Sequence, residues 1–512
     1  MLKNQVKAGA LLSYLQIFIG IIISISINRI VVSNLGQSEY GLMNLASSTL
    51  SYLNLLTLGV GSAFVRYNMK YRVAGDVEGE RKLNGIFLIL FAIISILMAV
   101  FGTILIGISQ FIFPKLTADE NRILQIIMII TLIQSCISVP VSIFVMNINA
   151  YEKFIFAKLV GIINTVLAPI GKLIIVLLGY KAIGISVVVL LLSILTALFE
   201  IIYAVKKVGV RFKFGKIDTK LIKSIYAFSA FIFLNQIIDM VNWQVDKLIL
   251  GVTSGAVAIS IYGLGASLNN YVMNFSTAIL GVLTPRVNKM VASGESKEEI
   301  TNIFIKTGRV QFIILALIML GLVFFGKPFI ENIYATNEYS ESYYVALLLI
   351  LPLIVPLIQN VGVEIQRAYN KHKFRSIAYA IMALLNLAMS IPLGMKYGAI
   401  GCAIGTCVSL IVGNGFIMNW YYHYKLGLNM KKFWWSIIKF VPSLIIPCVL
   451  GSLLMLFVDL SVVWLFFVCI VAFILVYAIS MFFLGINRDE RKVVISKIKK
   501  VLIIKDKEDI KE

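Results

Sequence analysis

Long, uninterrupted apolar segments dominate the hydrophobic pattern of this chain. Each runs for about 20 residues, the length that a helix needs to cross a bilayer. They lack the alternation of polar and apolar residues that is typical of transmembrane strands. The pattern predicts an all-α integral membrane protein with about 14 transmembrane helices. The predicted spans are 10–32, 40–62, 84–108, 122–147, 157–178, 182–205, 224–251, 254–280, 309–330, 342–366, 376–396, 399–422, 437–458 and 461–484.

The composition agrees with a membrane protein. Of the 512 residues, 60% are hydrophobic and 14% are charged, whereas about 25% of residues are charged in soluble domains. The first apolar run continues without a small-residue cleavage site, so we expect no cleavable signal peptide. The five cysteines lie in predicted spans without disulfide or metal-ligand spacing, which predicts packing roles and no metal site.

The net charge of +21 is distributed unevenly along the chain. Of the 46 basic residues, 38 lie in the terminal segments and in the alternate loops that share their side of the membrane. Five lie in the opposite loops and three lie inside spans. Basic residues accumulate in cytoplasmic loops, so this bias predicts that both termini are cytoplasmic. The excess charge therefore does not indicate a nucleic-acid partner.

Short motifs recur along the chain at a nearly constant offset. The offset is 218 from Arg29 to Lys247, 222 from Tyr40 to Tyr262, 220 from Arg66 to Arg286, 218 from Tyr151 to Tyr369 and 217 from Gly184 to Gly401. The repeat predicts two six-helix lobes related by a pseudo-twofold axis along the membrane normal, plus two extra C-terminal helices. The predicted domains are the N-lobe (1–205), a cytoplasmic inter-lobe linker (206–223), the C-lobe (224–422), the extra spans (423–484) and a basic amphipathic cytoplasmic tail (485–512).

The seventh predicted span carries an unusual polar face. At 100° per residue, seven of its residues fall within an arc of about 140°. They are Asn235, Gln236, Asp239, Asn242, Trp243, Asp246 and Lys247. Such an arc is unfavourable in contact with lipid, so we expect it to face other helices or a wet cavity. In the loop before the ninth span, Ser296 and Glu299 have capping-box spacing and predict the start of a helix.

Several of these motifs resemble a known family. They are Arg29 at the end of the first span, the segment LGQSEYGL at 35–42, Arg66 closing the second span, DKLILG at 246–251 and IYG at 261–263. They resemble the polysaccharide-transporter branch of the multidrug/oligosaccharidyl-lipid/polysaccharide exporter superfamily. The resemblance implies a flippase, not an enzyme, which moves undecaprenyl-pyrophosphate-linked oligosaccharide repeat units by alternating access. The products would be capsule, O-antigen or teichoic-acid-like polysaccharides.

The resemblance also implies a setting and partners. The protein would lie in the bacterial cytoplasmic membrane, in contact with the lipid bilayer, and would work beside a polysaccharide polymerase and glycosyltransferases. Two rival functions within the same superfamily stay open: a lipid II flippase and a cation-coupled multidrug antiporter. A channel or scaffold without turnover is a third class, which the polar groups at repeat-related positions disfavour.

Cations inside or near the spans are the candidates for binding an anionic headgroup. We expect them to line a cavity formed by spans 1, 2, 7 and 8, together with polar residues that contact sugars. The predicted substrate-binding residues are Arg29, Lys247, Lys172, Arg66, Arg286, Asn28, Asn164, Gln236, Asn242 and Trp243. The alternatives are snorkelling of Arg29 and Lys247 to the interface and a structural ion pair for Lys172.

Carboxylates inside spans are the candidates for ion coupling. The sequence offers Asp239, Asp246 and Glu364, and it favours Asp239 for exchange of a proton or sodium ion because no basic residue lies one helical turn away. In the alternative interpretation, Asp246 pairs with Arg29 or Lys247, and Glu364 pairs with Arg367 three residues later. No nucleotide-binding segment or organic cofactor is predicted. Transport would therefore depend on a proton or sodium gradient or on the membrane potential.

Overall fold

The computed structural model describes residues 2–57, 60–215, 219–369, 371, 373–488, 490–492 and 495–496. Within these ranges the chain is almost entirely helical and contains no strand. Ten of the helical segments in this part are long and apolar enough to cross a membrane. The protein is therefore an all-α multi-pass membrane protein, as its hydrophobic pattern predicts.

The helices accommodate the fourteen predicted spans. Two of the ten segments contain helices that are interrupted at a glycine, and each covers two predicted spans. These helices are α1 (Leu2–Ser51), interrupted at Gly36, and α14 (Lys373–Leu410), interrupted at Gly398. Helices α8 (Thr219–Thr253) and α9 (Ala256–Ala292) are not among the ten, yet they have 35 and 37 residues and match the seventh and eighth predicted spans.

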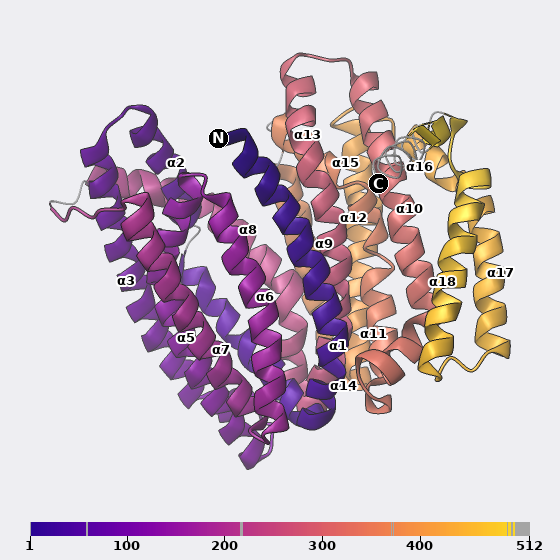
Figure 1. Cartoon of the computed structure of the whole chain (residues 1–512), viewed down its shortest axis with the longest axis horizontal. Helices are drawn as coiled ribbons and strands as arrows, with labels where there is room; N and C mark the ends of the chain where they lie inside the picture. Colours follow the sequence, from indigo (N-terminus) through magenta and orange to yellow (C-terminus); the bar gives the residue numbers. More distant parts are fainter. Residues whose placement is uncertain are drawn as a thin grey trace, which may run out of the picture. The chain divides into compact units, whose positions relative to one another are not determined.

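The chain forms two compact units, and the first comprises Met1–Asn274, Ile333–Leu349 and Lys373–Gly413. Its further helices are η1 (Tyr52–Thr57), α2 (Val60–Val73), α3 (Val77–Gly107), α4 (Ser109–Ile112), α5 (Ala118–Ala150), α6 (Phe154–Leu177), α7 (Lys181–Tyr203), η2 (Ala204–Val208), η4 (Asn337–Tyr339) and most of α11 (Glu341–Ile350). Figure 1 shows α3, α5 and α7 side by side, and α6 along α1. Helix α8 packs against α14.

Local chemistry sets where these helices begin. At the start of α5, the Thr117 hydroxyl accepts from the Glu120 amide at 3.2 Å, and the Glu120 carboxylate accepts from the Thr117 amide at 3.0 Å. This capping box satisfies amides that would otherwise lack partners. Inside the unit, Phe87 is fully buried and its ring lies 5.1 Å from that of Phe64.

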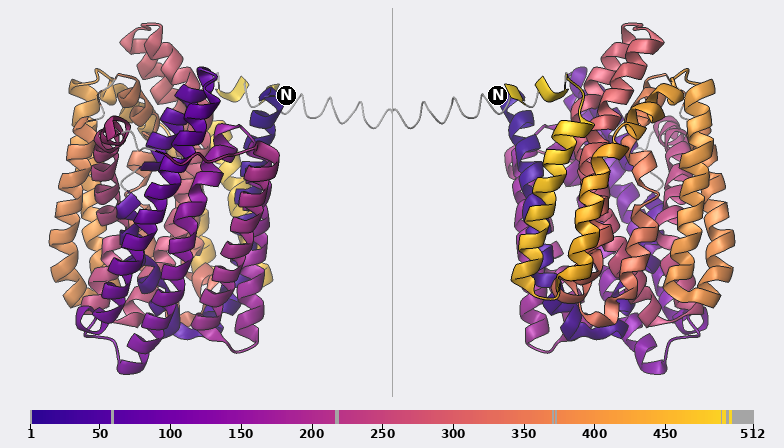
Figure 2. Two further views of the ribbon diagram at one scale, coloured as in Figure 1. Left: turned by 90° about the vertical axis from the view of Figure 1, so that its left-hand side faces the viewer. Right: turned by 90° about the vertical axis from the view of Figure 1, so that its right-hand side faces the viewer.

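The second unit comprises Phe275–Asn332, Ile350–His372 and Asn414–Glu512. Its helices include α10 (Lys297–Phe329), α12 (Ile354–Ile358), α13 (Val361–Ala368), α15 (Met418–Tyr424), α16 (Met430–Ile438), α17 (Val441–Phe457), α18 (Val463–Ser480) and η6 (Met481–Gly485). The short helices η3 (Ile330–Tyr334) and η5 (Ile411–Ile417) lie at its border. The right-hand view of Figure 2 shows α17 and α18 side by side. The predicted capping box is confirmed, because Ser296 accepts from the Glu299 amide at 3.2 Å and starts α10.

A buried arginine binds the segment around Glu490, near the end of the described chain, to α10. Arg309 of α10 is 2% exposed. Its guanidinium donates to both carboxylate oxygens of Glu490 at 2.8 Å and to the Ser436 carbonyl at 2.6 Å. It also lies 4.2 Å from the ring centre of Phe440. This Arg309–Glu490 clamp joins α10, the end of α16 and the segment after η6.

One predicted span differs from the structure. The tenth span, 342–366, is not one helix but three short ones, α11, α12 and α13. Pro352 lies at the break between α11 and α12, whereas Pro356 lies within the short α12, and proline lacks the amide that continues a helix. In the described part of the predicted linker 206–223, the Lys213 amide donates to the Arg81 carbonyl at 2.9 Å. The predicted amphipathic tail falls largely outside the described residues.

The backbone carries the internal repeat that the sequence predicts. Eight glycines have positive φ, a conformation open to glycine because it lacks Cβ. They form four pairs at offsets of 218 or 219: Gly36 and Gly255, Gly75 and Gly294, Gly179 and Gly398, and Gly209 and Gly427. The chain thus turns in the same way at equivalent places of both copies. The compact units combine parts of both copies, and the division into two lobes stays a prediction.

Candidate functional site

A buried carboxylate lies where three helices of the first unit meet. The side chain of Asp246, on α8, is 2% exposed. Its Oδ2 accepts hydrogen bonds from the Tyr262 hydroxyl of α9 and the Thr406 hydroxyl of α14, both at 2.5 Å. Its Oδ1 is buried and has no hydrogen-bond partner in the described part of the chain. Three helices therefore converge on one carboxylate that retains an unused acceptor.

A second layer of polar groups surrounds this carboxylate. The Asn386 amide donates to the Thr406 hydroxyl oxygen at 3.1 Å. The Ser390 hydroxyl lies 2.7 Å from Asn386 Oδ1 and 3.3 Å from the Cys402 carbonyl oxygen. All of these side chains are buried. We call the set of Asp246, Tyr262, Asn386, Ser390 and Thr406 the oxygen cluster.

The oxygen cluster contains the chemistry of a small cation or proton site. A buried carboxylate is unfavourable unless a proton, a cation or hydrogen bonds compensate it. Within the described residues, no ion pair of Asp246 occurs, so it pairs with neither Arg29 nor Lys247. Carboxylate, hydroxyl, amide and carbonyl oxygens are ligands of hard cations. The cluster can thus exchange a proton or hold a cation such as sodium.

Lys247 follows Asp246 on α8 but points to a different neighbour. Its Nζ lies 3.4 Å from Asn44 Oδ1 on α1, and its side chain is half-buried. The Asn44 amide group in turn donates to the Tyr40 carbonyl at 3.0 Å. No carboxylate pairs with Lys247 in the part of the chain that the structure describes. The ammonium group is therefore available to an anion.

The other polar residues of α8 have divided roles. Asn242 is buried and donates to the Ile238 carbonyl at 2.9 Å and to the Tyr379 carbonyl at 3.3 Å, so it joins α8 to α14. Asp239 is exposed, and Arg375 of α14 is its charged neighbour. The sequence showed no basic neighbour because it was considered along one helix only. Trp243 is half-buried.

The predicted residues of the N-terminal spans are spread over several contacts. Asn28 donates to the Tyr334 carbonyl at 3.1 Å, whereas Arg29 is exposed. Asn164 of α6 accepts from the Thr196 hydroxyl of α7 at 2.9 Å. Lys172 lies on the same face of α6 as Asn164. It is half-buried and has no ion-pair partner among the described residues.

Three further predicted residues lie apart from the oxygen cluster. Arg66 is exposed near the middle of α2. Arg286 belongs to α9, but its side chain lies outside the described part. Glu364 of α13 belongs to the second unit, where its carboxylate forms an ion pair with Arg367 at 2.8 Å. That pair is the alternative that the sequence offered for Glu364.

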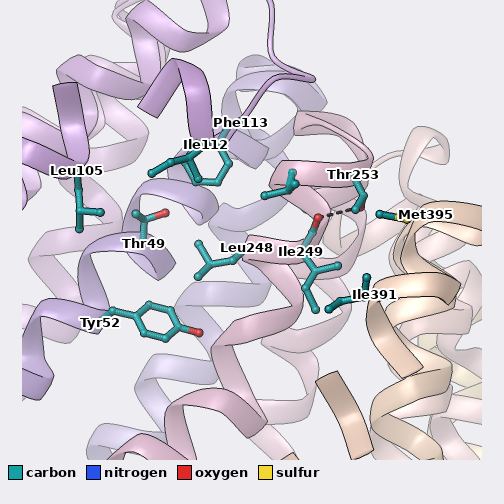
Figure 3. Close-up of a pocket in the computed structure, with 11 residues that line it drawn as sticks. Thr49, Tyr52, Leu105, Ile112, Phe113, Leu248, Ile249, Thr253, Ile391 and Met395 are labelled. Atoms are coloured by element: carbon teal, nitrogen blue, oxygen red, sulfur yellow. Dashed lines mark hydrogen bonds between the residues drawn. The ribbon is translucent and has the colours of Figure 1, made fainter. Parts of the chain in front are cut away.

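The described residues of the first unit line an apolar cavity. It measures about 420 Å³, and α8 contributes the residues that follow Lys247. Figure 3 shows Leu248 facing Thr49 and Tyr52 and Ile249 beside Ile391, and the Thr253 hydroxyl donates to the Ile249 carbonyl at 2.8 Å. The lining consists of Thr49, Tyr52, Leu105, Ile112, Phe113, Leu248, Ile249, Val252, Thr253, Ile391 and Met395.

The second cavity is polar and uncharged. It measures about 450 Å³ and lies among η1, α2, α3, α5 and α8. Its lining consists of Asn54, Thr57, Gly61, Phe91, Gln134, Ser135, Ser138, Val139, Ser142, Met146 and Gln236. Only Gln236 among these was predicted as a substrate contact. We call this space the serine cavity.

Sequence reasoning did not assign several residues of the oxygen cluster to the site. Tyr262 served only as a marker of the repeat, and Asn386, Ser390 and Thr406 were not considered. A signal was present, because Asn386 and Ser390 are polar residues four positions apart within an apolar span. Residues at that spacing share a helix face. Their convergence on Asp246 requires the packing of α8 against α14, which the sequence pattern does not reveal.

Comparison with known proteins shows the family of the chain and the fold that it shares. The model of the family described as "Polysaccharide biosynthesis protein" matches residues 6–291, more than half of the chain. No curated protein matches the sequence significantly. The structure of "Lipid II flippase MurJ, inward closed conformation" is similar with a TM-score of 0.68 at 17% identity, covering 92% of this chain and 97% of that one.

Other solved structures share the fold. An inward-facing multidrug resistance MATE family transporter of the MOP superfamily has a TM-score of 0.64 at 15% identity, covering 81% of this chain and 96% of that one. A MOP superfamily transporter from Pyrococcus furiosus has a TM-score of 0.53 at 15% identity, with coverage of 81% and 96%. At these identities the likeness concerns the fold. The family match carries the assignment.

Proposed function

We propose, from the premise that this chain belongs to the polysaccharide biosynthesis protein family, that it translocates undecaprenyl-pyrophosphate-linked oligosaccharide repeat units across the bacterial cytoplasmic membrane. Both termini face the cytoplasm in this proposal, because basic residues gather on their side. The protein acts as a transporter by alternating access and not as an enzyme. Glycosyltransferases supply its substrate, and a polymerase consumes the translocated product.

The observation that carries this proposal is the environment of Lys247. This cation lies within a transmembrane helix, is half-buried and contacts only the amide oxygen of Asn44 in the described part of the chain. A cation kept inside a membrane protein without a carboxylate is unfavourable unless it serves an anion. A pyrophosphate supplies that anion, and charge-assisted hydrogen bonds to phosphate oxygens are strong. Arg29 and Lys172 are further cations for the same headgroup.

The energy for transport comes from the membrane potential or from an ion gradient. An inside-negative potential favours outward movement of an anionic headgroup by about 2.3 kcal/mol per charge and per 100 mV. The oxygen cluster around Asp246 is the coupling site in this proposal. Of the three predicted carboxylates, Asp246 is the one that hydroxyl groups from two other helices hold in place.

Binding of an undecaprenyl-pyrophosphate-linked disaccharide to purified protein tests the proposal. Lys247→Ala removes the available cation and is expected to weaken binding at least tenfold, which corresponds to about 1.4 kcal/mol. Lys396→Ala is the matched control, because Lys396 lies on α14 beside the Tyr397 ring, 5.1 Å from its centre. The control variant is expected to bind like the wild type.

Melting temperatures of both variants establish that they are folded. Equal binding by folded Lys247→Ala and wild type would show that this cation does not serve the headgroup. A wild-type protein that binds neither the disaccharide lipid nor undecaprenyl pyrophosphate would overturn the proposed substrate class as a whole.

A further inference from the structure

The lining of the serine cavity combines polar and apolar side chains and carries no charge. Its polar side chains are amides and hydroxyls, and no acidic or basic side chain lines it. At about 450 Å³ it falls within the usual range of small-molecule sites, which is about 300–1,000 Å³. Hydroxyl and amide groups inside a membrane protein favour an occupant that forms hydrogen bonds with them over a pure hydrocarbon chain.

The hydroxyl groups of α5 are arranged as acceptors. Ser135, Ser138 and Ser142 lie on one face of this helix at spacings of three and four. The Ser138 hydroxyl donates to the Gln134 carbonyl at 2.8 Å, and the Ser142 hydroxyl donates to the Val139 carbonyl at 2.5 Å. The Ser135 hydroxyl likewise donates within its own helix, at 2.9 Å. Their protons are thus committed, and their oxygen lone pairs remain for a donor in the cavity.

Gln236 provides an independent sign of a missing donor. Its side-chain oxygen is buried and has no hydrogen-bond partner in the described part of the chain. Buried polar atoms are almost always paired, so an unpaired one requires an explanation. This oxygen belongs to the lining of the serine cavity and comes from α8, the helix that carries Asp246 and Lys247. A hydroxyl group of a ligand would satisfy it after the Gln236 side chain turns toward the cavity.

The cavity wall also offers an apolar surface. Phe91 of α3 lines it and is held in place by the Phe87 ring, 6.1 Å away. A sugar ring combines hydroxyl edges with C–H faces, so it matches a wall of acceptors beside an aromatic ring. An acidic or amino sugar would bring a charge without a counter-charge into this space, which is unfavourable.

We propose that the serine cavity binds an uncharged, hydroxyl-rich sugar residue of the translocated headgroup. This inference rests on the proposed function and adds the substrate class to it. In this arrangement Lys247 meets the pyrophosphate, while Ser138, Ser142 and Gln236 accept hydrogen bonds from sugar hydroxyls. The cavity therefore discriminates between headgroups by their sugar and not by their lipid.

The test compares two probes on each variant: undecaprenyl pyrophosphate without sugar, and undecaprenyl pyrophosphate bearing a neutral glucose disaccharide. Ser138→Trp fills the cavity from an exposed position of α5. Ile133→Trp is the matched control, since Ile133 is 45% exposed on the same helix and does not line the cavity. We expect Ser138→Trp to lose at least tenfold in affinity for the sugar-bearing lipid and to keep its affinity for the sugar-free lipid.

Ser138→Ala provides a second measurement should the large side chain prevent folding. It is expected to reduce the preference for the sugar-bearing lipid in part, whereas Thr131→Val, which removes a similarly bonded hydroxyl outside the cavity, is expected to leave it unchanged. Loss of both probes to the same extent, or no preference of the wild type for the sugar-bearing lipid, would overturn the inference. Either result leaves the proposed function standing if the wild-type protein binds undecaprenyl pyrophosphate.

Discussion

At the scale of single residues, Asp246 is the carboxylate best placed to respond to an ion. Hydroxyl groups of Tyr262 and Thr406 hold one of its oxygens, while the other is buried without a partner in the described chain. Asp239, by contrast, is exposed and has Arg375 as its charged neighbour. A site that binds an ion in one state and releases it in another requires an acceptor oxygen that is held in place but has no hydrogen-bond donor of its own.

Replacing Asp246 by asparagine keeps the shape of the side chain and removes its charge. We expect wild-type protein to gain thermal stability on addition of sodium or on protonation, because a ligand that binds only the folded state stabilises it, by about 2.7 kcal/mol at 100 times its Kd. Asp246→Asn is expected to lose this response. Asp459→Asn, which removes an exposed carboxylate beside the Ser461 amide, serves as the control.

Melting curves in sodium chloride and in choline chloride at equal ionic strength, each at two pH values, measure this response. An Asp246→Asn variant with the full wild-type response to both ions would remove the oxygen cluster from the coupling mechanism. Absence of any response in the wild type would have the same consequence.

The sequence predicted part of this site and missed part of it for a physical reason. Asp246 and Lys247 stood out because charge inside an apolar span is rare. Asn386, Ser390 and Thr406 did not, because uncharged polar residues are tolerated in spans and acquire meaning only through contact. We predicted that Asn242 contacts sugar, but its side-chain amide already donates to carbonyl groups of α8 and α14.

At the scale of elements, the Arg309–Glu490 clamp decides how the end of the chain is held. Burial raises the pKa of Glu490, but the hydrogen bonds from the Arg309 guanidinium and the Asn487 amide outweigh it, with further attraction from Arg309 and Lys306. The pKa of this carboxyl group is therefore below its ordinary value of 4.5. Its ionised form is favoured in the folded protein.

This shift fixes the sign of a pH dependence. A carboxyl group whose pKa is lower when folded stabilises the protein above its unfolded pKa, and the contribution disappears as the pH falls through the folded value. We expect the melting temperature to decrease on acidification below about pH 4.5, the ordinary value for Glu490. The decrease is expected to be smaller in Glu490→Gln than in the wild type.

Removing the other partner of the clamp has a larger effect. Arg309→Ala leaves a carboxylate and two carbonyl groups without their donor, and breaking a buried ion pair destabilises by about 3–5 kcal/mol. Glu298→Gln is the matched control, because its pair with Lys432 is exposed and such pairs contribute about 0–1 kcal/mol. Thermal unfolding in detergent at pH 7 measures both. Equal stability of Arg309→Ala and wild type would contradict the clamp.

The elements themselves were largely predictable. Spans followed from apolar length, and the start of α10 followed from Ser296 and Glu299, whose reciprocal hydrogen bonds are present. The tenth span was predicted wrongly as one helix, although Pro352 and Pro356 were visible in the sequence. Prolines are tolerated in transmembrane helices where neighbouring groups satisfy the backbone, so their presence alone does not decide between a kink and a break.

At the scale of the whole molecule, the backbone conformation repeats in the two copies of the duplicated sequence. The positive-φ glycines recur in pairs, such as Gly36 with Gly255 and Gly75 with Gly294, at the offset found for the sequence motifs. Duplicated transporters place their substrate site where the copies meet. The family assignment, the available Lys247 and the oxygen cluster agree with a transporter that moves an anionic lipid-linked sugar.

The most direct test of this account is translocation itself. Purified protein is reconstituted into vesicles that contain an undecaprenyl-pyrophosphate-linked oligosaccharide, and a glycosidase that cannot cross the membrane is added outside. We predict that wild-type vesicles expose the inner-leaflet pool to cleavage, whereas protein-free vesicles and folded Lys247→Ala vesicles release mainly the outer-leaflet pool. Protection of the inner-leaflet pool in vesicles with folded wild-type protein, under an imposed potential and ion gradient, would contradict the account.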